Sequence, residues 1–102
     1  MGEASNGIQA EQKVRELQPD VVLLDVDLPL LNGIELARRL HISYPNIKLV
    51  FVTTETSEEM AQFALSTGAS GYVLKSSIVA DLIPALAAAL SNKRFISKAV
   101  LK

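Results

Sequence analysis

The sequence predicts a single α/β domain in which helices cover a parallel β-sheet. Three short runs, at 21–26, 47–53 and 71–75, are rich in β-branched residues and almost continuously apolar, which is typical of strands buried on both faces. Segments with helical spacing of apolar residues separate these runs. The chain has 102 residues, of which 49% are hydrophobic, enough for one domain with its own core.

Apolar residues that recur every three or four positions indicate four helices. The expected ranges, in chain order, are 7–17, 32–44, 57–67 and 78–90. Ser57 is suited to cap the third helix, because Glu58 and Glu59 follow in the first turn, where carboxylates interact favourably with the helix dipole. Gly68 is expected just after this helix, in the left-handed conformation that ends many helices.

The last helix contains a local conflict. Pro84 lies inside it, lacks a backbone donor and crowds the residue four positions earlier. We therefore expect either a kink at Pro84 or a regular helix that begins close to it. Its apolar stripe is expected at Ile78, Leu82, Leu86 and Leu90, and residues 92–102 form a tail or the start of a further element.

Composition excludes several classes of protein. Ten basic and eleven acidic residues leave no excess positive charge, so direct nucleic-acid binding is not expected. No apolar run approaches about 18 residues, which argues against a membrane span. The chain has no cysteine and a single histidine, His41, so it has neither disulfides nor a thiolate or His-rich metal site. The amino terminus shows no targeting signal, and we expect a cytoplasmic protein.

Chemically useful side chains occur where each predicted strand ends. Asp25 and Asp27 close the first strand, Thr53 ends the second, and Lys75 ends the third. Ligands of open parallel sheets bind beyond these carboxyl ends. Each residue alone has an ordinary structural explanation, since Asp is common in turns and Thr in strands. Together, a carboxylate, a hydroxyl and an ammonium at one edge favour phosphoryl chemistry.

Three segments resemble those of bacterial response-regulator receiver domains, the CheY-like family. Residues 23–33, LLDVDLPLLNG, are similar to the phosphoacceptor segment of that family. Residues 52–54 resemble its switch-hydroxyl segment, and residues 68–75 resemble its aromatic-plus-lysine segment. The opening residues 2–7 are similar to receivers that precede a LuxR/FixJ-type helix-turn-helix.

The resemblance implies a flavodoxin-like fold and a phosphorelay role as a signalling switch, with a sensor histidine kinase as the partner. It assigns Asp25 as the aspartyl-phosphate site, with Thr53 and Lys75 as ligands of the phosphoryl group. It assigns Tyr72 as the aromatic rotamer switch. It also implies that Mg²⁺ is held by Asp25 and by the backbone carbonyl of Asp27.

The sequence also departs from the family pattern. The family begins with a strand that ends in an acidic pair, then a helix and a second strand, whereas this sequence begins at the end of that second strand. We therefore expect residues 1–102 to form one truncated receiver domain, with three main parallel strands, without the first strand, the first helix or an output domain. Without the acidic pair, Mg²⁺ binding and phosphoryl acceptance are expected to be weak. The exposed edge at Val21–Val26 predicts self-association.

Two other functions are compatible with the motifs. A non-phosphorylated interaction module, or pseudo-receiver, would keep the strand-end residues but lose metal binding, and titration with Mg²⁺ separates it from a switch. The segment Asp25-Val26-Asp27 also resembles the nucleophile motif of haloacid-dehalogenase-type phosphatases, with the second Asp as acid and base. That family needs a further acidic pair beyond the lysine, and Asp81 is the one acidic residue there.

Overall fold

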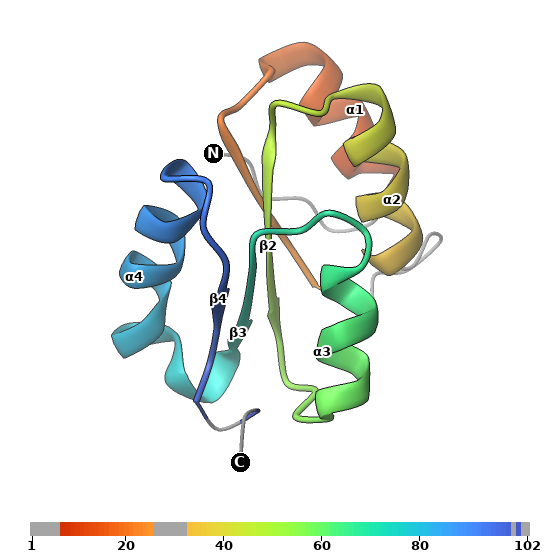
Figure 1. Ribbon diagram of the computed structural model, residues 1–102. Helices are drawn as coiled ribbons and strands as arrows, with labels where there is room; N and C mark the ends of the chain where they lie inside the picture. Colours follow the sequence, from red (N-terminus) through yellow and green to blue (C-terminus); the bar gives the residue numbers. More distant parts are fainter. Residues whose placement is uncertain (1–6, 26–32, 99, 101–102) are drawn as a thin grey trace.

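The computed structural model describes residues 7–25, 33–98 and 100. Helices and strands alternate along the chain (Figure 1). In order, they are α1 (Gly7–Leu17), β1 (Val21–Leu24), α2 (Gly33–Ser43), β2 (Lys48–Thr53), α3 (Glu58–Leu65), β3 (Gly71–Leu74), the 3₁₀ turn η1 (Lys75–Ser77), α4 (Ile78–Leu90) and β4 (Phe95–Ile96). The predicted order of helices and strands is confirmed.

The strands form one parallel sheet in the order β1-β2-β3-β4. Its register pairs Leu24 with Phe51 and Thr53 with Leu74, so β1, β2 and β3 end at nearly the same level. The sheet has one strand more than the three main strands expected. The extra strand, β4, lies in the segment expected to be a tail and pairs with Gly71 and Tyr72 of β3. Two residues are too short to give a periodic signal, and only pairing with β3 makes this segment a strand.

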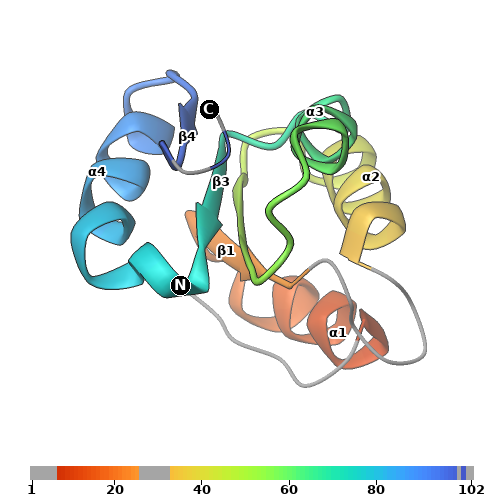
Figure 2. The same cartoon turned by 90° about the horizontal axis from the view of Figure 1, so that it is seen from below.

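Helices cover both faces of the sheet, as predicted. Helices α1, α2 and α3 lie on one side and α4 lies alone on the other (Figures 1 and 2). The core therefore has two parts. The larger includes Leu36, Phe51 and Tyr72, each fully buried, whereas the smaller joins Val50 and Val73 of the sheet to alanines of α4.

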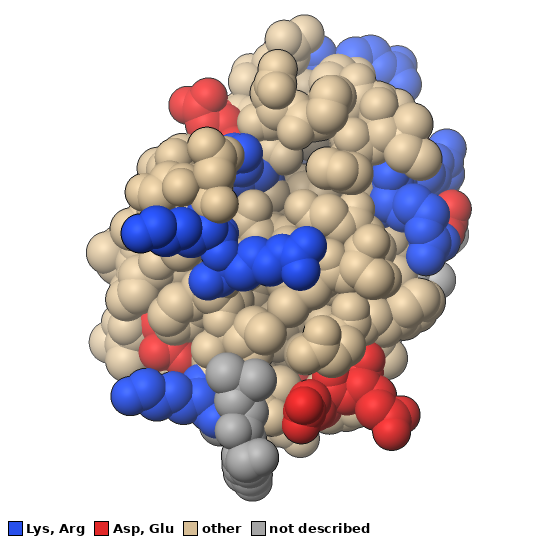
Figure 3. Space-filling model, in the orientation of Figure 1, with Lys and Arg blue, Asp and Glu red and all other residues tan. Residues whose placement is uncertain are grey.

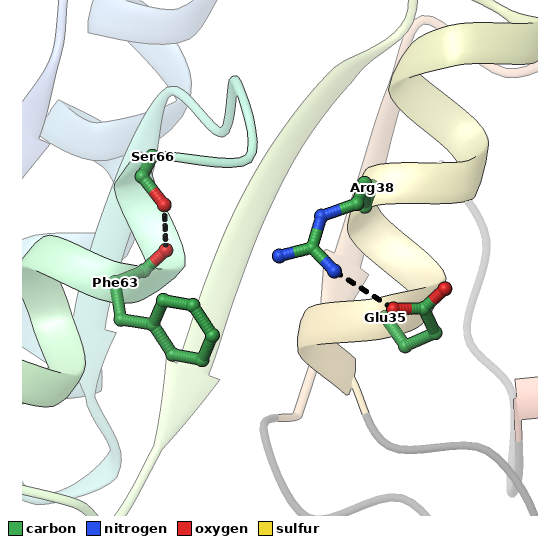
Figure 4. A network of polar contacts seen from close by, with 4 residues as sticks. All are labelled: Glu35, Arg38, Phe63 and Ser66. Carbon is green, nitrogen blue, oxygen red and sulfur yellow. Dashed lines mark hydrogen bonds and ion pairs between the residues drawn. The ribbon is translucent and has the colours of Figure 1, made fainter.

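The ends of α3 agree with the sequence. The Ser57 hydroxyl accepts a hydrogen bond from the Met60 amide at 3.2 Å, as an N-cap does. At the other end, the Ser66 hydroxyl donates to the carbonyl of Phe63, and Figure 4 shows this contact beside the Glu35–Arg38 ion pair of α2. Gly68 follows with φ of +101°, a conformation that favours glycine.

The expected apolar stripe of α4 is only partly right. Ile78, Leu82 and Leu86 are half-buried, but Leu90 is 61% exposed, and the residues fully buried on this helix are Ala85 and Ala89. A step of four residues advances about 40° beyond a full turn, so residues spaced by four drift off one face over three steps. Small alanines instead allow the helix to pack closely on Val50 and Val73.

Helix α4 runs unbroken from Ile78 to Leu90 with Pro84 inside it. The alternative in which the regular helix begins near Pro84 is therefore wrong. Pro84 is exposed, so its ring points away from the packed face and packing on the sheet holds the turns on either side of it. Within the described part of the chain, no helix has both the length and the apolar character needed to cross a bilayer.

Candidate functional site

The carboxyl edge of the sheet carries the residues expected there. Asp25 follows β1 directly, Thr53 is the last residue of β2, and Lys75 follows β3 directly. Because the strands are parallel and end at nearly the same level, their terminal side chains lie at one edge of the sheet. The chain connections that leave this edge lead to α2, α3 and α4.

Asp25 and Lys75 form an ion pair across this edge. The Lys75 Nζ atom donates to Oδ2 of Asp25 at 2.6 Å. The Asp25 side chain is 29% exposed and that of Lys75 is 49% exposed, so solvent weakens the attraction between them. Surface pairs of this kind contribute about 0–1 kcal/mol to stability. The pair is therefore better suited to orienting the two groups than to stabilising the fold.

Thr53 and Tyr72 are both buried, and both contact the backbone of Glu55. The Glu55 amide donates to Oγ1 of Thr53 at 3.2 Å, and the Tyr72 hydroxyl donates to the Glu55 carbonyl at 3.0 Å. The Tyr72 ring lies 6.3 Å from that of Phe51, centroid to centroid, on the face covered by α1 to α3. One turn of backbone thus joins the candidate switch hydroxyl to the candidate aromatic switch.

The acidic residues described before Asp25 lie elsewhere. Glu11 of α1 forms an ion pair with Arg39 of α2 at 3.3 Å, and Glu16 accepts a hydrogen bond from Gln12. Asp20 precedes β1 and so lies at the opposite edge of the sheet. The candidate metal ligand Asp27 lies outside the described residues.

Mg²⁺ prefers several oxygen ligands in octahedral geometry. Asp25 offers one carboxylate at this edge, and Lys75 already contacts it. Among residues 7–25, 33–98 and 100, no three His, Cys, Asp or Glu side chains gather into a metal-binding group. These donors fit a cation only partly.

Ser97, which is not predicted from the sequence, is fully buried just after β4. Its hydroxyl accepts from the Leu74 amide at 3.1 Å and donates to Oδ2 of Asp81 at 2.7 Å. No sequence signal marks it, because a serine in a short polar tail is unremarkable until β4 pairs with β3. Asp81, the one acidic residue after Lys75, where a haloacid-dehalogenase-type phosphatase needs an acidic pair, is thus bonded to Ser97.

Acidic side chains also gather at the amino-terminal end of α3, at the lower right of Figure 3. They include Glu58 and Glu59, which are exposed in the first turn of the helix. Negative charge at this position is favourable because it interacts with the positive end of the helix dipole.

The fold and the edge of strand-end residues define the class of protein. Residues 1–87 match the response regulator receiver domain family, and the chain belongs to this family. The haloacid-dehalogenase resemblance of Asp25-Val26-Asp27 thus does not define the family, and the relatives below are response regulators.

Two relatives illustrate the range of the match. The chain is similar to the response regulator GacA of Pseudomonas viridiflava, with 38% identity over 97 residues, which are 95% of this chain and 45% of GacA. It is also similar to the nitrate/nitrite response regulator protein NarL of Escherichia coli K12, with 36% identity over 100 residues, 98% of this chain and 46% of NarL. The chain spans about half the length of these curated relatives.

Solved structures confirm the predicted flavodoxin-like receiver fold. A two-component response regulator of the LuxR family from Aurantimonas sp. SI85-9A1 has a TM-score of 0.91 at 34% identity, covering 99% of this chain and 72% of that one. The response regulator domain of Thermotoga maritima CheB has a TM-score of 0.78 at 27% identity, covering 86% and 73%.

Proposed function

We propose that residues 1–102 form a single receiver domain that accepts a phosphoryl group on Asp25 and thereby switches a partner surface. The observation that carries the proposal is the contact of 2.6 Å between Asp25 and Lys75, at the strand edge where Thr53 also lies. A nucleophilic carboxylate next to an ammonium and a hydroxyl is the set of groups that phosphoryl transfer requires. The expected donor is a sensor histidine kinase, and the expected compartment is the cytoplasm.

In this reaction, a carboxylate oxygen of Asp25 forms a bond to phosphorus while the bond from phosphorus to the donor breaks. The electron pair of the broken bond leaves with the donor. Lys75 shifts its hydrogen bond from Asp25 to an oxygen of the incoming phosphoryl group and offsets its charge. Thr53 accepts from the Glu55 amide through Oγ1, so its hydroxyl proton is the group that can bind a second phosphoryl oxygen.

Mg²⁺, when bound, would shield the negative charge that develops between the carboxylate and the phosphoryl group. Asp25 would hold it, together with the carbonyl of Asp27. The described carboxylates ahead of Asp25 support the expectation that this metal site is weak. Glu11, for example, is paired with Arg39, and Asp20 lies at the opposite edge of the sheet. We therefore expect acceptance by this chain to be slow.

The switch would run through Glu55. If Thr53 turns its hydroxyl toward a phosphoryl group, its bond to the Glu55 amide is strained, and the turn that also holds the Tyr72 hydroxyl is released. The surface expected to change is formed by α3 and β3, which are in contact.

The direct test identifies the labelled residue. The chain is treated with acetyl phosphate and Mg²⁺ after addition, in cis, of a receiver segment that carries an acidic pair. We expect one phosphoryl group per chain by intact mass, lost in Asp25→Asn and kept in the matched control Asp20→Asn at the opposite edge. Labelling that survives Asp25→Asn, or no labelling of the supplemented chain, would overturn the assignment.

The second candidate is a pseudo-receiver that binds its partner without phosphorylation. The ion pair favours it to the extent that Lys75 keeps the Asp25 carboxylate occupied. Absence of labelling in the supplemented chain, with partner binding unaffected by Asp25→Asn, would favour this alternative.

A further inference from the structure

Strand β3, which Lys75 follows directly, is held at its end by a side chain from outside the predicted site. Strand β4 stops at Ile96, after two pairs with β3. The Ser97 amide still donates to the Tyr72 carbonyl at 3.0 Å, which completes the backbone ladder. Beyond that point, the Ser97 hydroxyl accepts from the Leu74 amide at 3.1 Å and so extends the ladder by one bond through a side chain.

Asp81 fixes the direction of this hydroxyl. Ser97 Oγ donates its proton to Oδ2 of Asp81 at 2.7 Å, which leaves its lone pairs for the Leu74 amide. A hydrogen bond to a carboxylate is stronger than one between neutral groups. Since Asp81 lies in the first turn of α4, the bond joins α4, the chain after β4 and the end of β3 through the buried Ser97 hydroxyl and the half-buried Asp81.

The position of this backbone matters because Lys75 must reach far. Asp25 follows β1 and Lys75 follows β3, with β2 between them. Adjacent strands lie about 4.8 Å apart, so the two strand ends are roughly 10 Å apart. The Lys75 side chain spans most of this distance to contact Asp25 at 2.6 Å, so the reach of its ammonium depends on where the backbone after Leu74 places it.

The backbone of Lys75 is also held on its other side. Its carbonyl accepts from the Ile78 amide at the end of η1. Leu74 and Lys75 are therefore bonded immediately before and after the point where the side chain departs. The bond from Ser97 is the one that depends on a side chain, and it can be removed by substitution.

From these contacts we infer that Ser97 and Asp81 are positioning residues that set the reach of Lys75 toward Asp25. The inference deepens the proposed function, on which its significance rests, since Lys75 is there the ligand of the phosphoryl group. The side-chain hydrogen bonds of these two residues are with each other and with the Leu74 amide. Their effect is exerted through the backbone of Leu74.

The test uses the Asp25–Lys75 ion pair itself as the readout, so it does not depend on phosphorylation. The carboxyl ¹³C signal of Asp25 and the ammonium ¹⁵N signal of Lys75 are recorded by NMR in the full chain. Lys75→Met gives the direction in which the Asp25 signal moves when the pair is lost. We expect Ser97→Ala to move both signals, with the Asp25 signal moving in that direction.

Thr67→Val is the matched control. The Thr67 hydroxyl is also buried and also bonds to the backbone, at 2.6 Å from the carbonyl of Ala64 in α3. It lies between α3 and the start of β3, whereas Lys75 follows the end of β3. Thr67→Val loses one hydrogen bond of a buried hydroxyl and Ser97→Ala loses two, so both variants are expected to lower the urea midpoint. Only Ser97→Ala should move the Asp25 and Lys75 signals.

A second pair of variants keeps the inference falsifiable if Ser97→Ala unfolds. Asp81→Asn retains an acceptor for the Ser97 hydroxyl and should move the two signals less than Asp81→Ala does. Signals that move no more in Ser97→Ala and Asp81→Ala than in Thr67→Val would overturn the inference. Failure of acetyl phosphate to label any version of the chain would count against the proposed function and leave this result intact.

Discussion

The hydroxyl of Tyr72 donates a hydrogen bond of 3.0 Å to the backbone carbonyl of Glu55. Glu55 lies two residues beyond β2, and its amide donates to the Thr53 side chain. Tyr72 is fully buried, so its ring can move only if neighbouring groups move, and its hydroxyl is bonded to the turn at Glu55. This relationship links the two candidate switch residues through the backbone of one residue, Glu55.

Substitution Tyr72→Phe should loosen this turn while keeping the buried ring. The loss of one hydrogen bond is expected to lower the free energy of unfolding by about 1 kcal/mol, measured by urea denaturation. Amide exchange should become faster from Glu55 into α3. In the chain supplemented with an acidic-pair segment, labelling at Asp25 should be retained, while binding of the partner changes. Tyr44→Phe, at the other end of the sheet, is the control, and equal loss of labelling and partner binding in Tyr72→Phe would contradict the switch.

Substitution Gly68→Ala should destabilise the chain for two separable reasons. The backbone there has φ of +101°, and an added Cβ would lie 2.7 Å from the His41 ring. The backbone strain alone should cost about 1–2 kcal/mol. His41→Ala in the same chain should recover the part due to the clash but not the strain, which a double-mutant cycle in urea measures. Full recovery, or none, would show that one of the two causes is absent.

Substitution Pro84→Ala should stabilise α4. Alanine restores the missing backbone donor and is favoured over proline by about 3 kcal/mol within a helix, from which about 1 kcal/mol is lost because the unfolded chain becomes more flexible. We expect a net gain of about 2 kcal/mol in the free energy of unfolding. Ile83→Ala, at a 70% exposed position beside it, is the control and should change stability by less than about 0.5 kcal/mol. A lower stability of Pro84→Ala would show that the proline ring makes a favourable contact.

The 102-residue chain should self-associate through the edge of β1. This strand lies at the end of the sheet in the described part of the chain, and its residues are apolar. An apolar edge of this kind can pair with another chain. Leu23→Lys should reduce the mass measured by light scattering, whereas Ile42→Lys, on a 74% exposed position of α2, should not. A monomer of the unaltered chain at high micromolar concentration would contradict this prediction.

The sequence predicted the elements whose pattern is local. Strands at β1, β2 and β3 were evident as apolar runs, and because parallel strands end together, Asp25 and Lys75 could be expected at one edge. The cap at Ser57 followed from its own short motif. Each of these depends on a few neighbouring residues.

Contacts that arise from tertiary packing could not be predicted. Strand β4 exists because α4 returns the chain to the side of β3, and Ser97 becomes buried only as a result. The buried face of α4 is selected by the fit of Ala85 and Ala89 against the sheet, although the leucines of that helix gave the stronger pattern. Hydrophobicity alone does not report which face can approach most closely.

The most direct test of Asp25 as a slow acceptor is the rate of phosphorylation of the 102-residue chain by acetyl phosphate with Mg²⁺, followed by intact mass. Lys75 pairs with Asp25, and the described carboxylates ahead of Asp25 lie elsewhere. Mg²⁺ is therefore expected to bind weakly, which leaves the negative charge at the acceptor poorly shielded. We expect slow or undetectable labelling of the chain alone, and restored, Asp25-dependent labelling when a segment with an acidic pair is supplied in cis or as a peptide. Rapid, stoichiometric, Asp25-dependent phosphorylation of the chain alone would contradict this expectation.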